Sequence, residues 1–118
     1  MSMSVHSITF DAADPVALAT FWSQVLDRPV DEGASDGFAQ LVPNRRTAGM
    51  MFIKVPEGKT AKNRVHLDLA ATDCEAEVQR LVALGATRGA EHDEQGIRWT
   101  VLADVEGNEF CVGSTSDS

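Results

Sequence analysis

Two side chains suited to acid–base chemistry stand two residues apart in a segment of alternating polarity. In residues 64–70, RVHLDLA, the apolar residues alternate with His66 and Asp68, so both polar side chains project from one side of the predicted strand. Imidazole titrates near neutral pH, and a neighbouring carboxylate can orient it. The pair therefore predicts either a catalytic base or the ordinary wet face of an antiparallel sheet, on which polar residues alternate outward.

An aromatic residue in a later strand offers a second feature of the same kind. Trp99 shares its strand face with Ile97 and Val101, so it either stacks on a ligand or packs in the core. His92 lies in the polar segment 91–96, which is predicted to be a solvated hairpin loop, with a mobile lid as the alternative. The sequence contains no phosphate-cradling glycine loop and no GxSxG, CxxC or HExxH motif.

The elements that carry these residues occur twice along the chain. Each half has an alternating strand, an amphipathic helix and shorter extended segments, and a shift of 59 residues places Ser7 on His66 and Thr9 on Asp68. The first helix begins with Asp14-Pro15, and the second begins with a capping box from Thr72 to Glu75. The extended candidates are residues 5–11, 28–30, 38–42, 50–55, 64–70, 87–88, 97–102 and 109–112, with a linker at 56–63.

Length and composition predict one domain with an acidic surface. The 118 residues carry a net charge of −8, which argues against nucleic acid as a partner. No apolar run is long enough to span a membrane, and no signal peptide is evident, so we expect a cytoplasmic protein. The cysteines, Cys74 and Cys111, are too few for a disulfide framework. Six of the ten Lys and Arg residues fall within 45–64, either as a solvated loop or as a rim that attracts a small anion.

Three stretches in this order resemble the glyoxalase/bleomycin-resistance group, the vicinal oxygen chelate superfamily. They are ITFDAADPVALATFW, NRVHLDLAATDCEAEVQRLVALGA and LADVEGNEFCV. The resemblance implies an α+β fold of two tandem βαβββ modules, at about 5–56 and 64–113 of a single domain spanning 1–118. It also implies a cupped, mostly antiparallel eight-stranded sheet with a helix packed on each half, and a homodimer.

The resemblance further implies where a metal would bind. Metal-dependent members take ligands from the first and last strands of each half, usually His, Gln or Glu. Those positions fall on Ser7, His66 and Cys111, with Ile53 within one residue of the fourth. Only His66 is a typical ligand of this group, so we expect no catalytic metal and no other cofactor. A divalent ion, Zn, Ni, Fe or Mn, is the alternative.

The function implied is binding of a small organic molecule in a cavity, without a catalytic metal. The expected ligand-binding residues are Ser7, Thr9, Ile53, His66, Asp68, Trp99 and Cys111. One alternative is a lyase, isomerase or dioxygenase resembling lactoylglutathione lyase, with His66 as ligand or base. A nucleophilic pair of Cys111 and His66 is weighed against simple packing of the thiol. The other alternative is an interaction module without chemistry.

Overall fold

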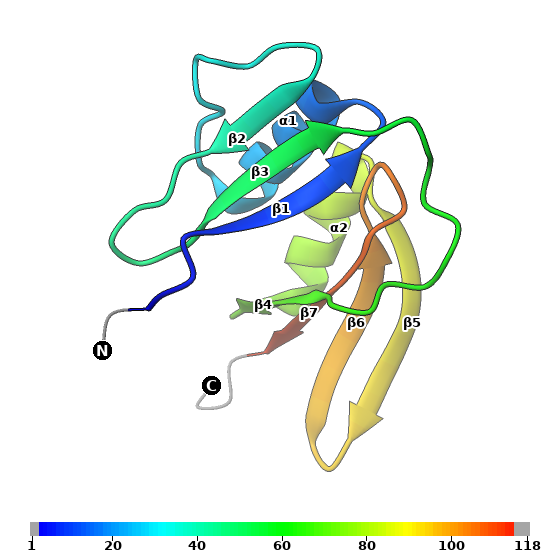
Figure 1. Cartoon of the computed structure of the whole chain (residues 1–118). Helices are drawn as coiled ribbons and strands as arrows, with labels where there is room; N and C mark the ends of the chain where they lie inside the picture. Colours follow the sequence, from blue (N-terminus) through cyan, green and yellow to red (C-terminus); the bar gives the residue numbers. More distant parts are fainter. Residues whose placement is uncertain (1–2, 115–118) are drawn as a thin grey trace. The chain divides into compact units, whose positions relative to one another are not determined.

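The computed structural model describes residues 3–114, and the chain divides into two compact units, Met1–Gly58 and Lys59–Ser118. The division lies inside the linker 56–63. Two helices and two mixed sheets make up the described residues, so the predicted α+β class is confirmed. Figure 1 follows these elements along the chain. No helix of the described residues is both long and apolar enough to cross a membrane.

Unit 1 packs one helix on a three-stranded sheet ordered β1-β3-β2. Strand β1 runs parallel to β3, and β2 runs antiparallel to it. The Asp14 carboxylate caps the helix by accepting from the Ala17 amide at 3.2 Å, as the sequence predicts. Phe10 lies against Trp22 and Phe52, with ring centroids 5.8 and 5.2 Å away. The elements are β1 (Ser7–Ala12), α1 (Pro15–Leu26), β2 (Phe38–Leu41) and β3 (Gly49–Lys54).

Unit 2 repeats this plan with one more strand, in the order β4-β7-β6-β5. Strand β4 runs parallel to β7, while the β5–β6 and β6–β7 pairs are antiparallel. Gly85 ends the helix with a positive φ of 120°, as predicted. The N-cap is Asp73, whose side chain accepts from the Ala76 amide at 3.1 Å, so the predicted capping box starting at Thr72 is wrong by one residue. The elements are β4 (Leu67–Ala71), α2 (Cys74–Leu84), β5 (Thr87–Glu94), β6 (Ile97–Ala103) and β7 (Glu109–Ser114).

The described residues do not form the single eight-stranded sheet that the resemblance implies. They form two sheets of three and four strands, and the predicted extended segment 28–30 is not a strand. Pro29 in that segment has no amide hydrogen to donate to a ladder. A backbone hydrogen bond from Asp31 to Gln40, at 2.9 Å, ties the segment that follows to β2.

The segment 91–96 is also not a loop. Residues 91–94 continue β5, and Gln95 and Gly96, with φ of 56° and 82°, form a two-residue turn into β6. Positive φ at both central positions is the mark of a type I′ hairpin turn. The structure therefore extends the short predicted strand 87–88 by six residues, to Glu94.

The turn between β6 and β7 is organised by one buried carboxylate. Asp104 is only 3% exposed, and its Oδ1 accepts from the amides of Glu106 and Asn108 at 2.9 and 3.0 Å. Its backbone carbonyl accepts from Gly107, whose φ is 89°. This turn sets where β7 begins, and β7 carries Cys111.

Replacing Asp104 tests this role. The Asp104→Ala variant leaves two turn amides without their acceptor, so we expect the free energy of unfolding to fall by about 1–3 kcal/mol. Urea denaturation followed by circular dichroism measures the change. Asp36→Ala, at an exposed loop position, is the control and should stay close to the wild type. An Asp104→Ala variant as stable as this control would contradict the account of the turn.

Candidate functional site

The candidate site lies on one face of the unit 2 sheet. On β6 and β7, buried Thr100, Leu102, Phe110 and Val112 alternate with residues of the opposite face. The opposite face carries Trp99, Val101 and Cys111, and the same alternation on β4 adds Asp68. The predicted alternation is found within β4 and β6, but β4 begins at Leu67 and not at residue 64, so His66 lies just before the strand.

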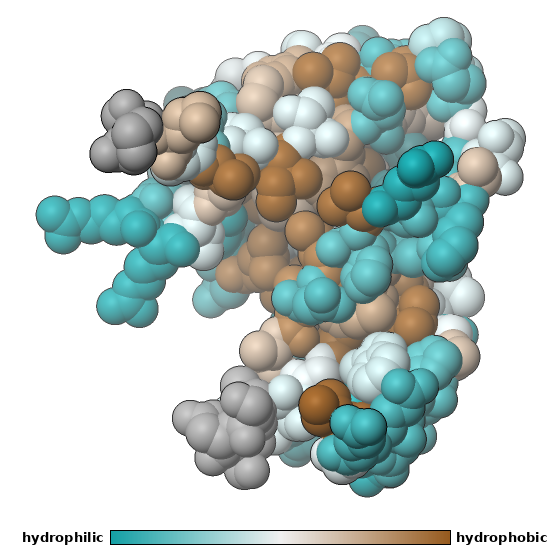
Figure 2. All heavy atoms as spheres, turned by 60° about the horizontal axis from the view of Figure 1, so that its bottom comes forward, coloured by the Kyte–Doolittle hydropathy of each residue, from teal (hydrophilic) through white to brown (hydrophobic). Residues whose placement is uncertain are grey.

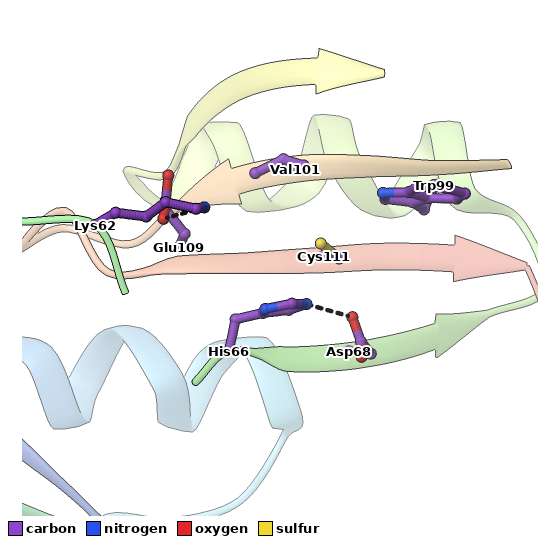
Figure 3. A pocket seen from close by; sticks show the side chains of 7 residues that line it. All are labelled: Lys62, His66, Asp68, Trp99, Val101, Glu109 and Cys111. Atoms are coloured by element: carbon purple, nitrogen blue, oxygen red, sulfur yellow. Dashed lines mark hydrogen bonds and ion pairs between the residues drawn. The ribbon is translucent and has the colours of Figure 1, made fainter. Parts of the chain in front are cut away.

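A pocket of about 380 Å³ opens on this face (Figure 3). Figure 3 shows Trp99 at one end, Lys62 and Glu109 at the other, and Cys111 between them. The lining residues are Lys62, His66, Asp68, Trp99, Val101, Glu109 and Cys111. Four of the residues predicted from the sequence (His66, Asp68, Trp99 and Cys111) are therefore brought together within unit 2.

His66 and Asp68 form the polar pair that the sequence predicts. The distance from His66 Nε2 to Asp68 Oδ1 is 3.2 Å, and the two side chains are 51% and 76% exposed. A pair this exposed adds little to stability, because water screens the interaction. Its effect is to orient the imidazole ring on the wall of the pocket.

Cys111 lies directly opposite Asp68 across the parallel β4–β7 pair. The residue is 9% exposed, and burial raises the pKa of its thiol, with the charge of Asp68 and a hydrogen bond to it acting in the same direction. A nucleophilic cysteine needs a lowered pKa and a positive neighbour. The structure therefore does not favour the nucleophilic pair of Cys111 and His66.

Lys62 and Glu109 form an ion pair at 3.3 Å at the far end of the pocket. The hydrogen bond from Lys62 lowers the pKa of the Glu109 carboxyl. Sequence reasoning did not select either residue. Glu109 stands two positions before Cys111 and so shares its face, which is the signal that was available. Lys62 belongs to the basic segment 45–64, but its place in the fold depends on the linker.

His92 supports the aromatic end of the pocket from the neighbouring strand. It pairs with Trp99 across β5 and β6, and their rings stack with centroids 5.1 Å apart and planes 20° apart. A stacked neighbour limits the rotation of Trp99, which lines the pocket. The signal for this contact was Gln95-Gly96, because a two-residue turn there places residue 92 opposite residue 99.

The other predicted residues lie in unit 1. The hydroxyl of Ser7 and Nδ1 of His6 form a hydrogen bond of 2.7 Å, and Thr9 is exposed on β1. Ile53 is 38% exposed on β3. None of them lines the pocket of unit 2, and their part in ligand binding stays a prediction.

The strand register corrects one position in this set. Thr9 pairs with Met51, just as Asp68 pairs with Cys111 in the second unit. Met51, and not Ile53, is therefore the first-half counterpart of Cys111. The pattern of two ligands from each half does not fit this chain, because the first half offers only the hydroxyl of Ser7 and the thioether of Met51.

Comparison with known proteins identifies the fold family. The glyoxalase-like domain family matches residues 7–113, which is nearly the whole chain. The chain belongs to this family. None of the curated proteins compared with it matches.

Solved structures of the same superfamily share the fold at low sequence identity. A glyoxalase/bleomycin resistance protein/dioxygenase family enzyme from Burkholderia phytofirmans PsJN is 20% identical with a TM-score of 0.76, over 92% of this chain and 96% of that one. Lactoylglutathione lyase from Agrobacterium tumefaciens is 16% identical with a TM-score of 0.68, over 97% and 95%. A superfamily member from Sphaerobacter thermophilus is 19% identical with a TM-score of 0.70, over 97% and 98%. Identities this low establish the glyoxalase-like fold and leave the chemistry to the residues of the site.

Apolar side chains also reach the surface of this glyoxalase-like domain (Figure 2). In unit 2 the most exposed are Val65 and Ile97, at 78% and 61%. Single exposed aliphatic residues are common on protein surfaces. The pocket is distinguished from them by its combination of an aromatic wall with charged and hydrogen-bonding groups.

The contact between Asp68 and Cys111 makes a testable prediction. Removing the negative charge in Asp68→Asn lowers the pKa of the Cys111 thiol, so more thiolate is present at a given pH. We expect iodoacetamide to alkylate Cys111 several-fold faster at pH 8, in a Cys74→Ser background that leaves one thiol. Mass spectrometry of timed samples measures the rate.

Glu77→Gln on α2 is the control for loss of an acidic charge elsewhere in unit 2. It should leave the rate unchanged. Equal rates in Asp68→Asn and the parent protein would show that the carboxylate does not act on the thiol.

Proposed function

We propose that this glyoxalase-like domain binds a small organic molecule in the pocket of unit 2. The observation that carries the proposal is the aromatic wall of Trp99, backed by His92, beside the polar pair of His66 and Asp68. The volume of about 380 Å³ falls within the range of small-molecule sites, which is about 300–1,000 Å³. A flat ring stacked on Trp99 would lie within reach of hydrogen-bonding groups, which matches the usual composition of such sites.

The charges around the pocket favour a neutral or cationic ligand. Two carboxylates, from Asp68 and Glu109, stand against one ammonium group, from Lys62. The chain as a whole carries −8, which attracts cations over a longer range. These charges support a planar aromatic compound with a basic group. The basic segment 45–64 suggested a rim that attracts an anion. At this pocket the positive charge of Lys62 is offset, because Glu109 pairs with it.

Binding to a panel of basic aromatic antibiotics and simpler aromatic amines tests the proposal. A compound that stacks on Trp99 should raise the melting temperature and quench tryptophan fluorescence, and the other tryptophan, Trp22, is buried in unit 1. Trp99→Ala should weaken the affinity at least about tenfold, since aromatic stacking and buried area together contribute more than about 1.4 kcal/mol.

The matched control is Val105→Ala, which removes an exposed apolar side chain outside the pocket. Its affinity should equal that of the wild type. The proposal fails if no compound binds across a chemically diverse panel, or if Trp99→Ala binds as well as the control.

A second candidate is a lyase or isomerase in which His66 acts as a general base. The observation that favours it is the distance of 3.2 Å between His66 Nε2 and Asp68 Oδ1, since a carboxylate that orients an imidazole is a common catalytic arrangement. The test is turnover of the hemithioacetal of glutathione and methylglyoxal, the substrate that lactoylglutathione lyases use. His66→Ala should reduce kcat at least about 100-fold if the ring transfers a proton. Activity equal to that of the wild type in this variant would exclude the base.

A further inference from the structure

We propose that unit 2 has a second binding site, for a small hydroxylated amine, on the side of its sheet that packs against α2. A pocket of about 410 Å³ opens there, beside the start of α2. We call it the helix-side pocket, and its lining includes Asp73, Glu75, Glu91, Arg98, Thr100 and Val112. Figure 3 views the sheet from the opposite face, with α2 behind it. The proposal does not rest on the small-molecule site, and Trp99 is the one residue that lines both pockets.

The floor of the helix-side pocket is a row of directly paired residues. Thr100 on β6 pairs with Glu91 on β5 and with Val112 on β7, so these three side chains project from the same face of the sheet. Directly paired residues of antiparallel strands have Cβ atoms about 4.5–5.5 Å apart. The register therefore places a carboxylate beside a hydroxyl, with an aliphatic side chain next to them.

The hydroxyl of Thr100 is the group in this row that calls for a ligand. Thr100 is only 4% exposed, and among residues 3–114 its hydroxyl has no hydrogen-bond partner. No fully enclosed side-chain oxygen or nitrogen of these residues lacks a partner, so the hydroxyl must reach the open space of the pocket. A buried polar group without a partner costs free energy unless water or a ligand reaches it. The Thr100 hydroxyl is therefore available to a molecule in the pocket.

The charges that line the helix-side pocket favour a ligand with an ammonium group. Three carboxylates line it, from Asp73, Glu75 and Glu91, against the single guanidinium of Arg98. That guanidinium is 3.7 Å from the carboxylate of Asp93, which offsets its positive charge. An ammonium group between Glu91 and Thr100 would gain an ion pair and a hydrogen bond at once.

Two positive features near the pocket are also offset. Arg88 donates to both carboxylate oxygens of Glu75, at 2.9 and 3.0 Å, but lies 3.8 Å from Glu91. The positive end of α2 is capped by Asp73, whose carboxylate accepts from the Ala76 amide at 3.1 Å. Glu91 has the longest of these contacts, so its carboxylate is the one that a ligand ammonium can reach with least competition.

The other groups of the pocket indicate that the ligand also carries hydroxyls. Thr72 and Ser114 line the pocket and are exposed, so they bring two more hydroxyls that can each donate and accept. Val112 adds an apolar surface for a compact ring. An amino sugar combines one ammonium group with several hydroxyls, and the pocket volume of about 410 Å³ is typical of small-molecule sites.

NMR titration of the ¹⁵N-labelled full chain with glucosamine tests the proposal, at a mildly acidic pH where the amine is protonated. The amide signals of Glu75, Glu91 and Thr100 should shift and saturate in the millimolar range, while those of His66 and Asp68 stay in place. N-acetylglucosamine has the same ring without the ammonium group, and it should bind at least about tenfold more weakly. Glucuronate, which carries a carboxylate instead, should not bind in the helix-side pocket.

Two variants test the floor of the pocket. Thr100→Val removes the hydroxyl and keeps the shape of the side chain, so it should weaken glucosamine binding about fivefold. Its melting temperature should not fall, because the hydroxyl has no partner to lose in the free protein. Glu91→Gln should weaken binding about threefold, since the carboxylate is partly exposed. Thr87→Val and Glu94→Gln, at exposed β5 positions outside the pocket, are the matched controls and should bind like the wild type.

The proposal is overturned if glucosamine gives no saturable shifts in the helix-side pocket, or if glucuronate binds there more tightly than glucosamine. Affinity that is unchanged in both Thr100→Val and Glu91→Gln would also overturn it, because the floor of the pocket would then take no part in binding. Shifts confined to His66 and Asp68 would place the amine in the other pocket and contradict this one. The aromatic panel tests the proposed function separately, so either proposal can fail without the other.

Discussion

The parallel pairing of β4 with β7 is the constraint on which the site depends. Its register places Asp68 opposite Cys111, and His66, the residue just before β4, has its Nε2 atom 3.2 Å from Asp68 Oδ1. A slip of one residue would turn a whole strand's side chains to the other face of the sheet. The buried residues Phe110 and Val112 hold this register, because any slip would expose them to water.

The sequence predicts well what depends on local periodicity. The alternation of residues 64–70 and 97–102 gives the correct face for Asp68 and Trp99, because the residues of the opposite face are less exposed than Asp68 on β4, and Thr100, next to Trp99 on β6, is buried. The helix caps are also predicted from local sequence. Asp14 caps the first turn of α1, and Gly85 ends α2. In the first unit the helix ends at Asp27, with φ of 54°, a conformation that aspartate tolerates better than most residues do.

What the sequence does not give is the pairing between strands. Met51 takes the place assigned to Ile53, and the contact of Cys111 with Asp68 appears only once β4 and β7 are aligned. His92 was assigned to a loop because its neighbours are polar, yet an exposed hairpin is polar on both faces and alternation is lost there. The stacking of His92 on Trp99 and the pairing of Cys111 with Asp68 were therefore missed for one reason, which is that cross-strand neighbours are fixed by the whole sheet.

The register of β4 against β7 can be measured directly by NMR. In the labelled chain, backbone nuclear Overhauser effects between neighbouring strands report which residues face each other. The account predicts contacts that align Asp68 with Cys111 and Leu67 with Phe110. Contacts that align Asp68 with Phe110 or with Val112 would contradict it, because the carboxylate and the thiol would then project from opposite faces of the sheet.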